Sequence, residues 1–93
     1  MYIEYEIEEN GYVRTFDYEV DYRYLREFII KLLCRDLKDV MGKMYSEDGA
    51  YQMANYMVWE LDCDEHLAKN VYYDEIKEHF EREAYEDYYR END

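Results

Sequence analysis

Residues 1–20, MYIEYEIEENGYVRTFDYEV, decide the fold, because two alternating stretches flank an Asn-Gly pair. Over residues 3–7 every second residue is apolar or aromatic and the residues between them are glutamates, as a half-buried strand requires. Asn10 and Gly11 both tolerate positive φ, which makes this pair the strongest short signal for a hairpin turn. The sequence therefore predicts an antiparallel hairpin whose second strand covers residues 12–20.

Beyond the hairpin the apolar period changes from two residues to 3.6, which predicts helices. The first helix begins after Asp21, whose carboxylate is expected to cap it, and ends at Gly42. Ser46 is expected to cap a second helix, and Asp64 a short turn that follows it. A last helix with a narrow apolar stripe is predicted over about residues 73–89.

The predicted fold class is α+β: an N-terminal two-stranded antiparallel hairpin followed by three helices packed on one face, in the order ββααα. An isolated hairpin is unstable in water, so helices must cover it. Because the chain has no proline and no glycine- and serine-rich linker, we expect a single domain over residues 1–93.

Tyrosine dominates the apolar part of the composition. The chain has 14 tyrosines but only 19 residues that are Leu, Ile, Val or Phe, which is near the level at which a highly charged chain stops folding. Each aromatic ring can bury roughly 150 to 250 Å² while it keeps a polar tip near water. We therefore expect more than half of the tyrosines to replace aliphatic residues in the core, and the rest to lie on the surface.

The formal net charge is -14, from 25 acidic and 11 basic residues. A field of this sign repels DNA, RNA and anionic lipid, so we expect no direct binding to nucleic acid and no membrane partner. No apolar stretch approaches the roughly 18 residues of a membrane span, and the N-terminus lacks the pattern of a signal peptide. The expected location is the cytoplasm, where Cys34 and Cys63 remain reduced thiols.

Residues 62–66, DCDEH, bring carboxylates, a thiol and an imidazole together, but they lack the CxxC, HExxH or EF-hand spacing of a metal site. A junction between helices explains the same residues, so we expect no metal and no cofactor. Neither His66 nor His79 neighbours a nucleophile signature, and Cys34 lies among leucines as a buried thiol. No residue is predicted to be catalytic, and the chain is not expected to be an enzyme.

The negative charge is unevenly distributed along the chain. Residues 1–20, 46–70 and 71–93 carry formal charges of -5, -5 and -6, whereas residues 21–45 carry +2. On the first strand, glutamates at every second position project from one face about 6.7 Å apart, a spacing comparable to that of successive phosphates. Arginine binds a carboxylate and a phosphate in the same forked geometry, so such a row can occupy a site built for nucleic acid.

The candidate partner-binding residues comprise this row, acids of the last helix and two aromatic anchors whose rings offer π-faces to arginine. They are Glu4, Glu6, Glu8, Asp74, Glu78 and Glu81, with Tyr2 and Tyr18 as the anchors. Two plainer interpretations remain open, because a solvated strand face needs polar residues and charges on an exposed edge prevent aggregation. On the last helix, Glu78–Arg82 and Glu86–Arg90 have the spacing of favourable pairs that neutralise part of the charge.

In its size, its acidity and its lack of a catalytic signature, the chain resembles the small inhibitors encoded by bacteriophages and mobile elements. These include DNA-mimicking anti-restriction and anti-CRISPR proteins, and the resemblance covers bulk properties without a shared motif. It implies a non-enzymatic protein that blocks the channel of a basic nucleic-acid-binding protein, such as an effector nuclease of the host. The alternative hypothesis is a tyrosine-rich homodimer whose acidic surface keeps it soluble.

Overall fold

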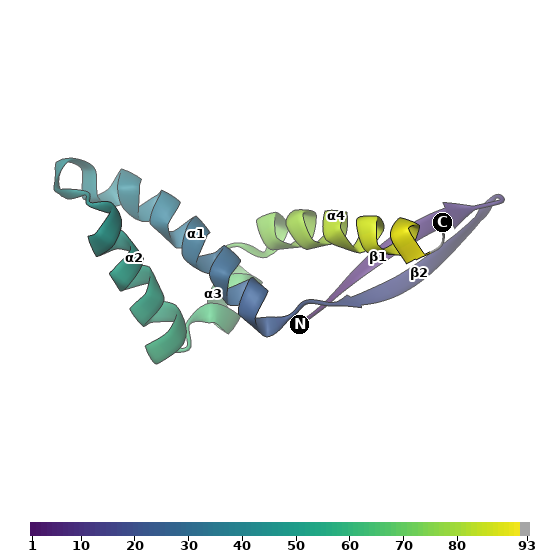
Figure 1. The fold of residues 1–93 in the computed structure, drawn as a ribbon, viewed down its shortest axis with the longest axis horizontal. Coiled ribbons are helices and arrows are strands. Elements are labelled where there is room, and N and C mark those ends of the chain that lie inside the picture. The colour runs from purple at the N-terminus through teal and green to yellow at the C-terminus, as the bar shows by residue number, and fades with distance from the viewer. Residues whose placement is uncertain (92–93) are drawn as a thin grey trace.

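The N-terminal hairpin is present as the sequence predicts. The computed structural model describes residues 1–91, and Figure 1 shows β1 (Tyr2–Glu9) beside β2 (Tyr12–Glu19). The strands are antiparallel, and the numbers of paired residues sum to 21 along the whole ladder. Asn10 and Gly11 form the turn with φ of 52° and 81°. Positive φ at both positions matches the twist of the two strands, so the turn type follows directly from these two residues.

Four α-helices follow the hairpin, because the short turn expected near Asp64 forms a helix of its own. The Asp21 carboxylate accepts a hydrogen bond from the Arg23 N–H at 2.8 Å, and Gly42 follows the end of this first helix with φ of 57°. Ser46 Oγ caps the second helix as predicted. The helices are α1 (Tyr22–Met41), α2 (Glu47–Asn55), α3 (Asp64–Asn70) and α4 (Tyr73–Glu91), with a 3-10 turn over Gly42–Met44 and a π-helical segment over Tyr56–Glu60 that prolongs α2. None of the helices within residues 1–91 combines the length and the apolar character needed to cross a membrane.

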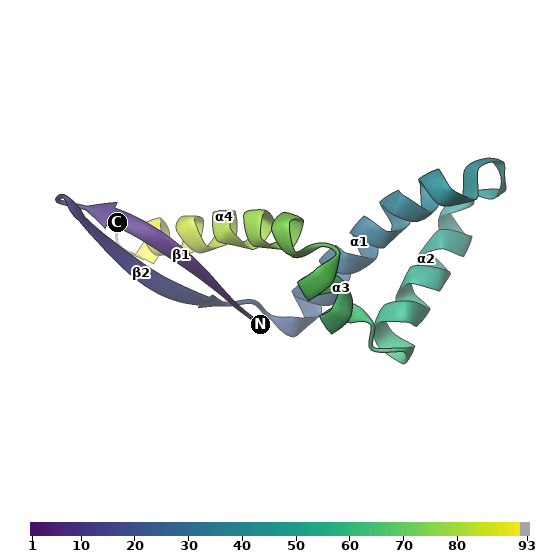
Figure 2. The same cartoon turned by 180° about the vertical axis from the view of Figure 1, so that it is seen from behind.

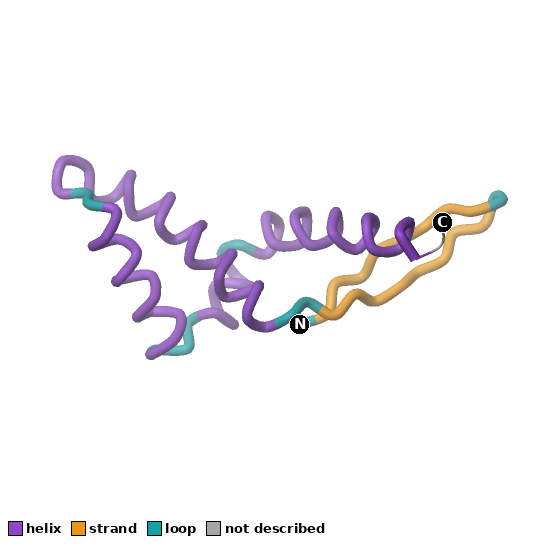
Figure 3. The backbone as a smooth tube through the Cα atoms, viewed as in Figure 1, coloured by secondary structure: helices purple, strands orange, loops and turns teal. Residues whose placement is uncertain are grey.

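The elements form two arms that meet near α3. In Figures 1 and 2, α4 runs along the hairpin, while α1 and α2 form an antiparallel pair that extends in the opposite direction. Figure 3 shows the same division, with the strands confined to one arm. The molecule measures 54 × 23 × 23 Å and has a radius of gyration of 16.2 Å. A compact domain of this length has a radius of gyration of about 12 Å, so the chain is a rod rather than a sphere.

The core consists of two apolar clusters, and the larger one joins the two arms. The larger cluster joins α1, the π-helical segment, α3 and the start of α4, and it reaches the hairpin through Ile3 and Val20. The smaller cluster joins Tyr5 and Ile7 of β1 to Ala84 of α4. The apolar stripe of α1 is therefore covered largely by other helices, and α4 supplies the helical cover that the hairpin needs.

The expectation that most tyrosines fill the core is wrong. Tyr5 and Tyr72 are buried and four others are half-buried, but eight of the fourteen are exposed. The elongated shape is the physical reason, because a rod leaves more of the chain exposed than a sphere does. The accessible surface of the protein is 7104 Å². A compact monomer of this mass exposes roughly 5,900 Å². Much of the aromatic surface therefore faces solvent, where tyrosine is suited to anchor a partner.

Candidate functional site

The outward face of the hairpin carries carboxylates and no basic side chain. It consists of the even-numbered residues of β1 and the odd-numbered residues of β2, which the register places on one side of the sheet. Arg14, the one basic residue of the hairpin sequence, is paired with Ile7 and therefore belongs to the opposite face. We call the following five exposed residues the hairpin acidic face: Glu4, Glu6, Glu8, Asp17 and Glu19.

None of the five carboxylates of the hairpin acidic face makes an ion pair with any other residue in the described range 1–91. The three glutamates of β1 form the predicted row of exposed anions, about 6.7 Å apart along the strand. Asp17 and Glu19 add a second row on β2 that the sequence analysis did not assign to the site. The signal was present, because a two-residue turn fixes the register and places Asp17 opposite Glu4.

Glu4 and Asp17 lie at close quarters across the two strands. The Val20 N–H donates to the Met1 carbonyl at 2.8 Å, so Met1 and Val20 form a hydrogen-bonded pair. Because the two pair types alternate along the ladder, the odd-numbered residues of β1 form hydrogen-bonded pairs with β2, and the even-numbered residues form non-hydrogen-bonded pairs. Glu4 and Asp17 therefore form a non-hydrogen-bonded pair, in which the Cα atoms of antiparallel strands are only about 4.5 Å apart and the side chains are closest. Like charges in this position repel and lower the stability of the hairpin. Charges that protect a strand edge against aggregation do not have to face each other across the strands, as Glu4 and Asp17 do.

Relief of this repulsion provides the first prediction. We expect Glu4→Gln to raise the free energy of unfolding by about 0.2–1 kcal/mol, the range of a cross-strand side-chain pair. Glu6→Gln is the matched control, because Glu6 faces the uncharged Thr15 and its replacement should stabilise the protein less. Urea unfolding of the two variants measures the difference. Equal stability changes in both variants, or a loss of stability in Glu4→Gln, would show that the cross-strand repulsion is absent.

Glu81 of α4 joins the hairpin acidic face at the free edge of β1. It lines a surface hollow together with Glu4, Glu6, Tyr85 and one basic residue, Lys77. The Tyr85 hydroxyl donates to the Glu6 carbonyl at 2.9 Å and lies 3.3 Å from the Glu81 carboxylate. Desolvation and the nearby Glu81 carboxylate raise the pKa of Tyr85, so its hydroxyl stays protonated at neutral pH and remains a donor. The structure thus brings together three predicted acids from two distant segments.

Glu78 and Asp74 lie about one and two turns before Glu81 on α4, and they continue the acidic surface with less net charge. They share a second hollow with Glu81, which is also lined by Lys77 and Arg82. Arg82 lies 3.8 Å from the Glu78 carboxylate, as the spacing predicts. Near the end of α4, Arg90 pairs with Asp87 at 3.8 Å instead of the expected Glu86. The acids of α4 are therefore partly neutralised by ion pairs, whereas the five acids of the hairpin acidic face form no ion pair within residues 1–91.

The two predicted aromatic anchors lie on opposite faces. Tyr2 is 67% exposed and shares the outward face with Glu4. Tyr18 is half-buried and belongs to the inward face, because its position on β2 is paired with Ile3. Its hydroxyl donates to the Asp87 carboxylate at 3.3 Å, and desolvation together with that carboxylate raises the pKa of Tyr18. The structure therefore corrects the grouping of Tyr18 with the glutamate row and assigns it to the contact between the hairpin and α4.

The segment DCDEH forms a buried ion pair that the sequence analysis missed. Asp64 does not cap a turn but is the first residue of α3 and is only 1% exposed. Its carboxylate lies 3.3 Å from the Arg26 guanidinium, which also meets the Asp62 carboxylate at 3.1 Å. The Arg26 guanidinium lies over the rings of Tyr22 at 4.3 Å and Trp59 at 4.5 Å. This cage of two rings and two carboxylates joins α1, the π-helical segment and α3 at the meeting point of the arms.

Over residues 1–91, no group of three or more His, Cys, Asp or Glu side chains is arranged to hold a metal ion. Comparisons with models of protein families, with curated proteins and with solved structures find no match for this chain. The hairpin acidic face, extended by Glu81, is therefore judged on its own geometry and charge.

Proposed function

We propose that this protein is a small non-enzymatic inhibitor of the anti-CRISPR or anti-restriction type. Its hairpin acidic face occupies the basic nucleic-acid-binding channel of an effector nuclease or a similar protein, so that the nucleic acid is excluded by competition. The observation that carries this proposal is the pair of exposed carboxylate rows without a basic residue on the same face.

The chemistry of the two rows fits a site that evolved for phosphates. A guanidinium group forks onto a carboxylate as it does onto a phosphate, and both anions are held at regular spacing along an extended backbone. Charge complementarity of this kind raises the association rate and selects basic partners over acidic ones. The net charge of -14 of the whole chain keeps the protein itself away from nucleic acid, so it competes for the partner without binding the partner's ligand.

The hairpin is held in place by contacts that leave its outward face open. Tyr88 donates to the Glu9 carboxylate at 2.6 Å, and the ring of Tyr5 packs edge-on against Tyr85 with centroids 5.5 Å apart. Phe16 stacks on Tyr5 across the strands. These contacts all lie on the side of α4. A carboxylate row on such a support loses less conformational freedom on binding than a row on a mobile loop would lose.

Affinity capture from a bacterial lysate tests the proposal. The immobilised wild-type protein is expected to retain a basic nucleic-acid-binding protein, and the variant with Glu4→Lys, Glu6→Lys and Glu8→Lys is expected to lose it. The matched control reverses three exposed acids outside the hairpin that make no ion pair within residues 1–91, namely Asp39→Lys, Glu60→Lys and Glu86→Lys. Both triple variants have the same net charge. Loss of the captured protein from both variants alike would attribute binding to the overall charge and contradict the proposal.

The extent of the exposed surface favours a second candidate function, the tyrosine-rich homodimer. The protein exposes roughly 1,200 Å² more than a compact monomer of its mass, which is comparable to what one partner buries in a stable interface. Light scattering at micromolar concentration separates the candidates. A monomer supports the inhibitor, and a dimer that dissociates when Tyr51 and Tyr56 are replaced by serine supports the homodimer.

A further inference from the structure

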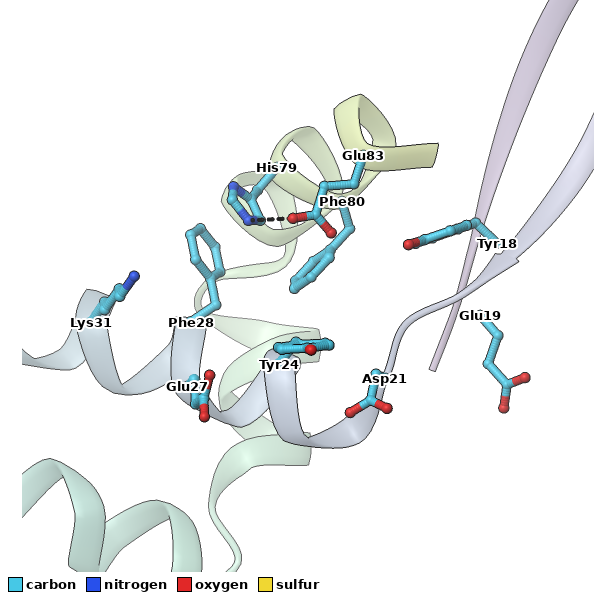
Figure 4. A pocket seen from close by; sticks show the side chains of 10 residues that line it. All are labelled: Tyr18, Glu19, Asp21, Tyr24, Glu27, Phe28, Lys31, His79, Phe80 and Glu83. Atoms are coloured by element: carbon cyan, nitrogen blue, oxygen red, sulfur yellow. Dashed lines mark ion pairs between the residues drawn. The ribbon is translucent and has the colours of Figure 1, made fainter. Parts of the chain in front are cut away.

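A surface hollow lies where β2, α1 and α4 come close to one another. Its volume is about 470 Å³. Figure 4 shows the rings of Tyr24, Phe28 and Phe80 gathered between α1 and α4, with Tyr18 pointing in from β2. We call it the aromatic hollow, defined by its ten lining residues: Tyr18, Glu19, Asp21, Tyr24, Glu27, Phe28, Lys31, His79, Phe80 and Glu83.

The charge of the aromatic hollow is negative. Four of its lining residues are acids and one is lysine, which gives a formal charge of -3 with His79 neutral. Glu83 lies 3.5 Å from the His79 ring, which in turn stacks on Phe28 with centroids 4.2 Å apart. Glu19 and Glu27 make no ion pair with any residue in the range 1–91. Aromatic walls beside unpaired carboxylates are the combination that attracts a flat organic cation.

The same chain shows how it binds such a cation. Arg26 lies between the rings of Tyr22 and Trp59 and meets the carboxylates of Asp62 and Asp64. The aromatic hollow repeats this set of rings and carboxylates, but its basic lining residues are a lysine and a histidine, and no arginine lines it. The hollow therefore offers a guanidinium the same kinds of partner, aromatic rings and carboxylates, in a more exposed setting than that of Arg26.

We infer that the aromatic hollow binds an arginine side chain of the partner. A guanidinium stacks on aromatic faces and forks onto carboxylates, whereas the ammonium of lysine is more strongly hydrated and lacks a planar face. Glu19 belongs to both the hollow and the hairpin acidic face, so a single basic surface reaches both. The inference rests on the proposed function and deepens it, since it names the side chain that the partner inserts.

A small probe tests the hollow separately from the hairpin row. N-acetyl-L-arginine amide, titrated into the labelled protein, is expected to shift the backbone amide signals of Tyr24, Glu27 and Phe80 with a dissociation constant on the order of 1 mM. N-acetyl-L-lysine amide is expected to bind at least about five-fold more weakly. Tyr24→Leu and Glu27→Gln, two replacements on the exposed side of α1, should each weaken binding of the arginine probe by about two- to five-fold.

The control variant with Glu4→Gln and Glu6→Gln should leave binding of the probe unchanged. Absence of shifts at the hollow, equal binding of the two probes, or unchanged binding in both Tyr24→Leu and Glu27→Gln would each overturn the inference. The capture experiment with the hairpin variants is independent of these outcomes. A failed titration beside a successful capture removes the arginine site alone. A successful titration beside a failed capture removes the inhibitor proposal, and with it the partner's arginine as the occupant, and leaves a site that binds a guanidinium.

Discussion

Replacement of Arg26 by methionine is expected to lower the free energy of unfolding by about 3–5 kcal/mol, because it leaves the buried Asp64 without a counter-charge. Arg26 is 8% exposed and Asp64 is 1% exposed, so water cannot solvate the orphaned carboxylate. The second carboxylate of the cage, Asp62, is 73% exposed and loses little when the guanidinium is removed. Urea unfolding followed by circular dichroism measures the loss.

The double variant with Arg26→Met and Asp64→Leu is the control for this prediction. Because both buried charges are then gone, and the replacements are apolar and of similar volume, most of the lost stability should return. A single variant that loses less than about 1 kcal/mol would show that the cage is not a buried ion pair in solution. A double variant no more stable than the single one would assign the loss to packing on Tyr22 and Trp59 instead.

Neutralisation of the glutamate row is expected to weaken binding to the captured partner by at least about 100-fold at low salt. The variant with Glu4→Gln, Glu6→Gln and Glu8→Gln keeps the shape of each side chain and removes only its charge. Close charge pairs across interfaces contribute from about 1.5 kcal/mol each, so the loss of three such pairs exceeds two orders of magnitude in affinity. Isothermal titration with the purified partner gives the dissociation constants.

The salt dependence of the same measurement separates local from global electrostatics. The Debye length falls from about 10 Å at 0.1 M salt to about 3 Å at 1 M, so the wild-type affinity should fall steeply and that of the neutralised variant much less. The matched control neutralises Asp39, Glu60 and Glu86 and should keep the steep dependence. A wild-type affinity that is the same at low and high salt would contradict a carboxylate row that replaces phosphates.

The hairpin was predictable because its determinants are local. Alternation over a few residues and the positive φ of Asn10 and Gly11 define both strands and their register, and short-range capping by Asp21 and Ser46 defines two helix starts. The outward row of glutamates follows from the same alternation. The two-residue turn fixes the register, and the register places Asp17 and Glu19 on the same face as the glutamates of β1. The whole hairpin acidic face can therefore be predicted from the sequence.

The arrangement of the helices was not predictable from these patterns. An apolar stripe shows that one side of a helix is covered, but it does not show which element covers it. The stripe of α1 is covered largely by other helices and not by the hairpin, and this arrangement produces the rod. The Arg26–Asp64 pair joins positions 38 residues apart, and neither residue type is expected in a core until its partner is known. Tyr18 was misplaced for a related reason, since its hydroxyl meets an acid, Asp87, 69 residues away.

Competition with nucleic acid for the captured partner tests the central claim most directly. The dissociation constant between this protein and the partner is measured at increasing concentrations of the duplex or single strand that the partner binds. If the hairpin acidic face replaces phosphates in the channel, the apparent dissociation constant rises in proportion to the nucleic-acid concentration and no ternary complex forms. An unchanged dissociation constant, with all three components in one complex, would contradict the account.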